Sequence, residues 1–156
     1  MNKPRSHGDE RIGNLGLAAY LKMQGCKVTG RSGNMVFFEC STDEEREKIN
    51  QHKIDYVNSP FAEFDGWLMT MKNMPTTPID MVNPALQEIR SMGMATFIKM
   101  RTNWRLVGRP DNNKFVFMVP VNETHKFEEF QFEWANHPLR NFDASMMSLK
   151  SIRIRR

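Results

Sequence analysis

The sequence has little of what marks a membrane, exported or metal-binding protein. No apolar run approaches the roughly 18 residues that a membrane span needs, and the N-terminal stretch MNKPRSHGDER is polar throughout, unlike a signal peptide. The chain holds only two cysteines and four histidines, without the spacing of a zinc site. We therefore expect a cytoplasmic protein that neither crosses a membrane nor binds a metal ion.

Recognisable catalytic motifs are also missing. The sequence has no C-x-x-C, no G-x-S-x-G, no P-loop and no G-x-G-x-x-G. Acidic pairs such as Glu44-Glu45 and Glu128-Glu129 are better explained as solvated helix faces than as catalytic dyads. We predict a protein without enzymatic activity, cofactor or small-molecule substrate.

The sequence does contain a long internal repeat. The segment CKVTGRSGNMVFFEC at 26–40 has a counterpart, WRLVGRPDNNKFVFMVP, at 104–120, and both read as β-hairpins. The similarity continues upstream, where GLAAYLKM at 16–23 meets GMATFIKM at 93–100. A spacing of 77 to 80 residues is too long for a solenoid repeat of about 20 to 50 residues. We predict a domain duplication.

Each copy is expected to form an α-β-β-α-α unit, which makes the fold α+β. A unit of roughly 65 residues is marginal alone, so we expect the two to pack about a pseudo-two-fold axis. Their hairpins would then either combine into one antiparallel sheet or be covered by helices. The predicted bounds are a disordered tail at 1–12, a first repeat at 13–74, a proline-rich linker at 75–83, a second repeat at 84–152 and a basic tail at 153–156.

Local signals place the helices. Asn14 is the expected N-cap of the first helix, and the overlapping S/T-x-x-E boxes in STDEE at 41–45 begin another. In the second copy, Asn83-Pro84 is expected to begin a longer helix that ends at Met100.

The two cysteines lie in the first hairpin. Cys26 and Cys40 fall opposite each other if the hairpin turns at 32–34, and could then bond in an oxidising compartment. The second copy has Trp104 and Pro120 at those places, so the fold does not need the bridge. We expect reduced thiols.

Alternation along the strands predicts which hairpin residues face the core. In the first copy these are Cys26, Val28, Val36, Phe38 and Cys40, and in the second Trp104, Leu106, Val116 and Met118. The other face would combine basic and aromatic side chains, as single-stranded nucleic acid requires for phosphate contacts and for base stacking. The candidate binding residues are Lys27, Arg31, Phe37, Arg105, Arg109, Phe115 and Phe117, together with Arg153, Arg155 and Arg156 of the basic tail.

A second interpretation of this face stays open. Exposed phenylalanines on a two-stranded ribbon are ordinarily covered, either by the hairpin of the other copy or by a helix. The charge distribution gives modest support to binding. Residues 1–78 hold 10 basic and 10 acidic residues, whereas 79–156 hold 12 and 8, so the net charge of +4 lies in the second copy. That excess suits a polyanionic partner, and it equally suits an ordinary solvated surface.

The L-A-A-Y-L-x-x-x-G start at Leu17–Gly25, the K-V-x-G hairpin, the F-F-E-C strand and Val57-x-x-Pro60 resemble a small domain of unknown function that recurs in bacteriophage and mobile-element proteins. The resemblance covers 15–74 and, more weakly, 92–152, where Ala95-Thr96-Phe97-Ile98 replaces A-A-Y-L. Its motifs are structural and carry over no functional residue. It implies a phage-type accessory protein in a bacterial cytoplasm.

These observations lead to one preferred function and two alternatives. The preferred function is non-enzymatic binding of nucleic acid, DNA or RNA, through the basic and aromatic hairpin face and the basic C-terminus. The first alternative is a protein-binding inhibitor or modulator of a host system, such as a defence or transcription complex. The second is a minor structural component of a virion.

Overall fold

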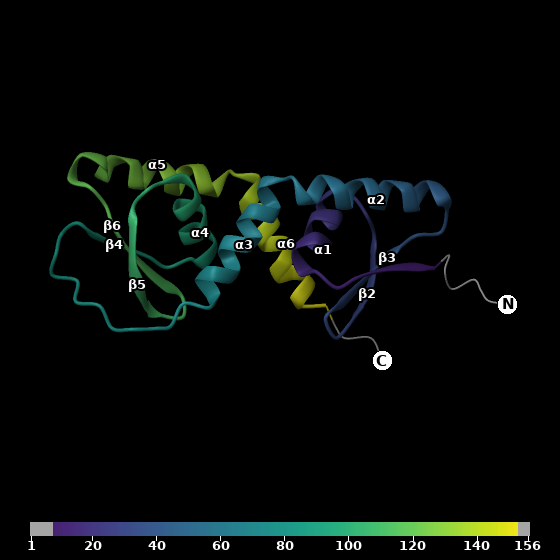
Figure 1. Cartoon of the computed structure of the whole chain (residues 1–156), viewed down its shortest axis with the longest axis horizontal. Helices are drawn as coiled ribbons and strands as arrows, with labels where there is room; N and C mark the ends of the chain where they lie inside the picture. The colour runs from purple at the N-terminus through teal and green to yellow at the C-terminus, as the bar shows by residue number, and fades with distance from the viewer. Residues whose placement is uncertain (1–7, 153–156) are drawn as a thin grey trace. The chain divides into compact units, whose positions relative to one another are not determined.

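The computed structural model describes residues 8–152, so Arg153, Arg155 and Arg156 lie outside the described residues. The described chain is α+β, with six α-helices, one short 3-10 helix and two three-stranded antiparallel sheets (Figure 1). It divides into two compact units. Unit 1 contains the described residues up to Ala62 and those from Asn141 onward, and unit 2 is Glu63–Arg140.

The first half of the chain has the order strand, helix, strand, strand, helix, helix, and the second half repeats it. The first half comprises β1 (Asp9–Ile12), α1 (Leu15–Met23), β2 (Val28–Ser32), β3 (Met35–Glu39), α2 (Asp43–Val57) and α3 (Pro60–Lys72). The second comprises β4 (Leu86–Ile89), α4 (Met92–Arg101), β5 (Arg105–Asp111), β6 (Lys114–Met118), η2 (Val121–Glu123), α5 (Thr124–Ala135) and α6 (Pro138–Lys150).

Each sheet has a first strand that the sequence did not predict. Residues 9–12, expected within a disordered tail, form β1, and β4 lies where a long helix was expected. The helix prediction at Asn83 was wrong because Asn83 Oδ1 accepts from the Ala85 N–H in a turn, and the N-cap of α4 is instead Ser91. A four-residue strand is stabilised by its neighbours rather than by its own sequence.

The hairpins do not combine into one sheet in the described part of the chain. The strand orders are β1-β3-β2 and β4-β6-β5, so that each sheet belongs to one half of the sequence. In both, the last strand in sequence lies at the centre and pairs antiparallel on each side. Each hairpin is joined by β1 or β4 as its third strand. The hairpins therefore do not pair with each other, as one prediction had proposed.

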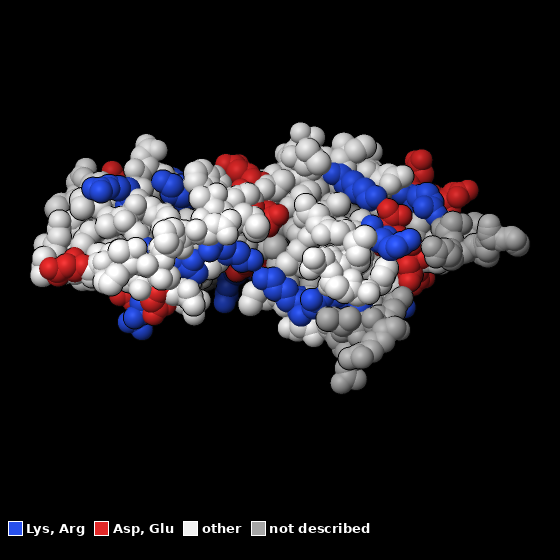
Figure 2. All heavy atoms as spheres, turned by 60° about the horizontal axis from the view of Figure 1, so that its bottom comes forward, with Lys and Arg blue, Asp and Glu red and all other residues white. Residues whose placement is uncertain are grey.

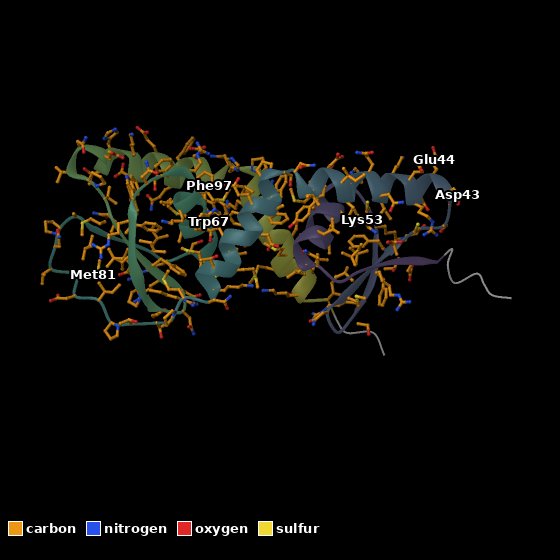
Figure 3. All side chains as sticks on the ribbon, in the orientation of Figure 1. Asp43, Glu44, Lys53, Trp67, Met81 and Phe97 are labelled. Carbon is orange, nitrogen blue, oxygen red and sulfur yellow. The ribbon has the colours of Figure 1, made fainter. Side chains whose placement is uncertain are left out.

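In unit 1 the predicted core face is largely confirmed. Val36 and Phe38 of β3 and Cys40, which follows the strand, are buried, and α1 packs against β1 and β3. The helix α2 begins at the predicted capping box, in which Thr42 Oγ1 accepts from the Glu45 N–H at 3.1 Å. Figure 3 shows the acidic side chains of its first turn, which the helix dipole favours there.

In unit 2 the prediction of an exposed face on β6 was wrong. Phe115 and Phe117, expected to be exposed, are fully buried. In the strand pairing, Ile89 lies opposite Phe115 just as Ile12 lies opposite Val36 in unit 1. Phe115 therefore occupies the position in unit 2 that Val36 occupies in unit 1. The sequence comparison had placed Val116 there. A slip of one residue moves every side chain of a strand to the other face.

The other face of β6 is covered as well. Val116 is buried and pairs with Gly108, where an added Cβ would lie only 3.0 Å from the Ile79 side chain. The linker is held against β5, because the Thr77 N–H donates to the Arg109 carbonyl at 2.8 Å. The linker thus shields the face on which a binding platform was expected.

Both cysteines are free in the structure. Burial raises the pKa of the Cys26 and Cys40 thiols above their ordinary value. Each thiol is thereby kept in the less reactive protonated form at neutral pH.

The start of α6 contains a histidine that should make stability depend on pH. His137 Nδ1 accepts from the Leu139 N–H at 3.1 Å. Burial lowers the pKa of His137, with Glu133 opposing the shift and Arg101 adding to it. The neutral ring is therefore favoured in the folded state. The contribution of His137 to the free energy of unfolding is complete above the unfolded pKa of about 6.5. It is lost as the pH falls through the lower folded pKa.

We expect His137→Ser to remove this part of the pH dependence. Serine stands at the matching place in the first half, where Ser59 Oγ accepts from the Ala62 N–H. The check is the urea midpoint at about pH 7.5 and about pH 5 for both proteins, a range that spans the titration. An equal decline in the variant would show that another group titrates.

Candidate functional site

The residues predicted to bind a partner are not brought together by the fold. Phe115, Phe117 and Arg109 are buried, Phe37 is half-buried, and Arg105 is exposed. In unit 1, Lys27 is exposed and forms an ion pair of 3.6 Å with Glu39. Among the predicted residues within 8–152, only Arg105 and Lys27 thus combine exposure with a position in a pocket.

Two of the three predicted strand arginines, Arg31 and Arg109, bind the ends of helices. Arg109 donates to the carbonyls of Lys72 and Met74 at 2.9 Å each, and to that of Asn112 at 2.8 Å. Its guanidinium also lies 5.4 Å from the centre of the Phe115 ring. These contacts satisfy carbonyls that the end of α3 leaves open, so Arg109 is a structural residue.

Arg31 has the matching role at the end of α6. Its guanidinium donates to the Lys150 carbonyl at 2.6 Å and to the Ile152 carbonyl at 3.4 Å. It also donates to Gly33 in its own turn. Arg31 is therefore engaged and does not offer a free cation for a phosphate.

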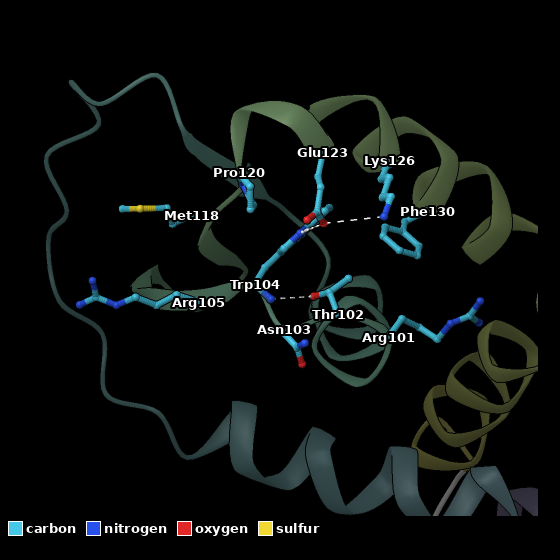
Figure 4. Close-up of a pocket in the computed structure, with 10 residues that line it drawn as sticks. All are labelled: Arg101, Thr102, Asn103, Trp104, Arg105, Met118, Pro120, Glu123, Lys126 and Phe130. Atoms are coloured by element: carbon cyan, nitrogen blue, oxygen red, sulfur yellow. Dashed lines mark hydrogen bonds and ion pairs between the residues drawn. The ribbon is translucent and has the colours of Figure 1, made fainter.

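A pocket of about 530 Å³ lies in unit 2, between the end of α4, the start of β5 and the helix α5 (Figure 4). Its size falls within the range of sites for small ligands or parts of larger ones. We call it the unit 2 pocket. Its charged lining residues are Arg101, Arg105, Glu123 and Lys126, and its aromatic lining residues are Trp104 and Phe130.

The floor of the unit 2 pocket is held by hydrogen bonds. Thr102 ends α4, and its Oγ1 accepts from the Trp104 N–H at 3.2 Å. This turn directs Trp104 inward, where its Nε1–H donates to Glu123 at 2.9 Å. The Phe130 ring meets the indole edge-on at 5.5 Å. Trp104 is buried and Phe130 is half-buried, so Phe130 is the ring that can meet a ligand.

The unit 2 pocket carries an excess of positive charge. Three basic residues and one acidic residue line it, which gives a formal charge of +2. Lys126 Nζ lies 3.9 Å from Glu123, and Arg101 forms an ion pair with Glu133 at 2.5 Å. Arg101 and Arg105 extend outward on opposite sides (Figure 4). Cations that point apart suit several phosphates along a chain better than one chelated anion.

Unit 1 has a smaller pocket of about 380 Å³ between the corresponding elements. Its charged residues are Lys27, Lys48, Glu39 and Glu45, for a formal charge of zero before His52 is considered. Met118 takes the register position of Glu39 in unit 2, so the paired acid is absent there. The lining of the unit 2 pocket is therefore more basic than that of the unit 1 pocket.

The sequence analysis missed Arg101, Lys126 and Phe130 as site residues. Arg101 follows Lys99 in the last turn of α4, where basic residues are expected for helix stability alone. Lys126 is a single lysine on a mixed helix. The repeat offered a signal, because Lys48 and Lys126 lie at the same spacing as Glu45 and Glu123.

On the face drawn in Figure 2, Lys and Arg side chains, some of them side by side, occur with fewer acidic ones among larger areas of uncharged residues. Within residues 8–152, no group of three or more His, Cys, Asp or Glu side chains could hold a metal ion. None of the described helices is long and apolar enough to cross a bilayer.

Comparisons of the chain with protein-family models, with curated proteins and with solved structures found no match.

Proposed function

We propose that the protein is a non-enzymatic nucleic-acid-binding protein that contacts single strands through the unit 2 pocket. The observation that carries the proposal is that Arg105, Lys126 and the half-buried Phe130 ring line one pocket. The cations would bind backbone phosphates and the ring would stack on a base. Phe115, Phe117, Arg31 and Arg109 have no part in this site.

The proposal includes an internal duplication. It is supported by the repeated element order, by the strand orders β1-β3-β2 and β4-β6-β5, and by the side-chain caps Asn14 and Ser91 at the starts of α1 and α4. After duplication, loss of the acid at the Met118 position would leave the second copy with the basic pocket. With the sequence resemblance, this fits a phage-type accessory protein in a bacterial cytoplasm.

The test is a salt titration of binding to short fluorescent single strands, followed by anisotropy. Arg105→Ala with Lys126→Ala should lower affinity and reduce the slope of log affinity against log salt by about 1.4, at about 0.7 for each lost phosphate contact. Phe130→Leu should weaken binding with little change of slope, because stacking releases no counterions.

The matched control is Lys27→Ala with Lys48→Ala, which removes two cations from the balanced unit 1 pocket. It should leave binding unchanged. If the wild type shows no saturable binding at about 50 mM salt, where phosphate contacts are strong, or if both double variants act alike, the proposal fails.

The alternative of a protein-binding modulator of a host system is favoured by a different observation. Exposed apolar side chains recur at matching places in the two halves. Ile54 and Phe132 are 59% and 75% exposed, and Met69 and Met147 are 51% and 59% exposed. An apolar protein interface would change little with salt, so the same titration with a protein partner separates the two functions.

A further inference from the structure

The two compact units do not coincide with the two halves of the sequence. The boundary cuts α3 after Ala62 and α6 after Arg140. The greater part of α3, from the first half, therefore belongs to unit 2, and the greater part of α6, from the second half, belongs to unit 1. We call α3 and α6 the closing helices.

In unit 2 the closing helix is held along its length by residues of the second half. Phe64 of α3 stacks on Trp134 with ring centres 5.8 Å apart. Lys99 Nζ lies 5.8 Å from the centre of the Trp67 ring. At the end of the helix, Arg109 binds the Lys72 carbonyl.

Unit 1 holds its closing helix in the same way, with residues of the first half. The Phe142 ring of α6 lies 6.3 Å from Tyr56 and 5.2 Å from Phe61. Lys22 Nζ donates to Ser148 Oγ at 3.0 Å. Arg31 binds the carbonyl of the last residue of α6.

These contacts give two pairs of polar residues at matching places in the halves the same role. Lys22 and Lys99 both reach a closing helix from α1 and α4, and Arg31 and Arg109 both bind its last carbonyl. In every case the helix and its clamp come from different halves of the sequence. Each unit thus has a set of side chains, here called its groove, that contact a closing helix and bind the carbonyl of its last residue.

We infer that the two halves of the chain are reciprocal binding partners, each donating its closing helix to the groove of the other, and that their association does not depend on the linker. A chain whose halves folded separately would come apart when the linker is cut. With two helices exchanged, the fragments stay together.

The experiment is a cut in the full-length protein at an engineered protease site between Met81 and Val82. Both residues are exposed and lie in the linker, where Figure 3 labels Met81. We expect the cut protein to elute from a sizing column as one species, with the untagged fragment retained by a tag on the other. Two separated fragments at micromolar concentration would overturn the inference.

The linker itself contacts β5, so a variant that affects the binding of α6 tests the inference more clearly than one that affects α3. Arg31→Leu removes the clamp on α6 and should raise the dissociation constant of the cut protein about tenfold or more, as expected for lost hydrogen bonds of a charged group. Arg11→Leu is the matched control, because Arg11 is an exposed arginine of the same fragment. Equal effects of the two variants would contradict the inference.

A second variant tests the inference independently if Arg31→Leu fails to fold. Met146→Ala shortens a buried side chain of α6 and should likewise favour dissociation of the cut protein, while the uncut variant keeps its circular dichroism. If Met146→Ala leaves the dissociation constant of the cut protein unchanged, α6 does not hold the halves together and the inference is wrong.

Discussion

Phe117→Ala should lower the free energy of unfolding by about 3–5 kcal/mol, the usual range when a buried phenylalanine is truncated. Phe117 is fully buried at the centre of the unit 2 sheet. It pairs with Leu106 of β5 on one side and with Gln87 of β4 on the other. Truncation would remove apolar contacts and leave a cavity between packed elements that can close only in part.

Urea unfolding followed by circular dichroism measures this loss. Phe132→Ala is the control, since Phe132 lies on α5 with 75% of its surface exposed and its truncation should change stability by no more than about 0.5 kcal/mol. A small effect at Phe117 together with weakened nucleic-acid binding would mean that the ring is accessible after all. The buried register of β6 would then be wrong.

Arg109→Met should lower the free energy of unfolding by roughly 2–4 kcal/mol, because hydrogen bonds of a charged group are each worth about 1.5–3 kcal/mol and are not additive. The side chain is 8% exposed. Its loss leaves three carbonyls, those of Lys72, Met74 and Asn112, without this donor. The end of α3 and the turn between β5 and β6 would loosen together.

Two comparisons isolate the role of the planar guanidinium. Arg105→Met, an exposed arginine of the same strand, should change stability by no more than about 0.5 kcal/mol. Arg109→Lys keeps the charge but lacks the fork that reaches several acceptors at once, so it should recover only part of the loss. If Arg109→Lys is as stable as the wild type, charge alone accounts for the arginine.

Much of the local structure could be predicted because its causes lie within a few residues. The N-cap at Asn14 and the capping box at Thr42 were both confirmed. A cap depends on a side chain and a backbone N–H three residues apart. The core face of β3 was confirmed for the same reason, since alternation within one strand places Val36 and Phe38 together.

The candidate site could be predicted only in part. Of four predicted binding residues in the second hairpin, Arg105 lines the unit 2 pocket, whereas Phe115, Phe117 and Arg109 are buried. For Phe115 and Phe117 the error came from one residue of register. The β5 strand has register shifts on both sides of Gly108, whereas β2 has one, between Val28 and Gly30. The additional shift displaces β6 by one residue relative to the sequence comparison. An alignment of the two segments cannot locate a bulge, because the bulge is defined by pairing with the neighbouring strand.

By itself, the sequence determined the repeated helix and hairpin pattern, the caps and the α+β class, all of which follow from short-range periodicity. Tertiary structure alone decided the strands β1 and β4, the register of β6 and the exchange of closing helices. The apolar stripes of α3 and α6 are alike, and Arg31 and Arg109 bind backbone carbonyls that every helix end offers. Either groove could accept either helix on local grounds. Which helix fills which groove therefore depends on the path of the whole chain.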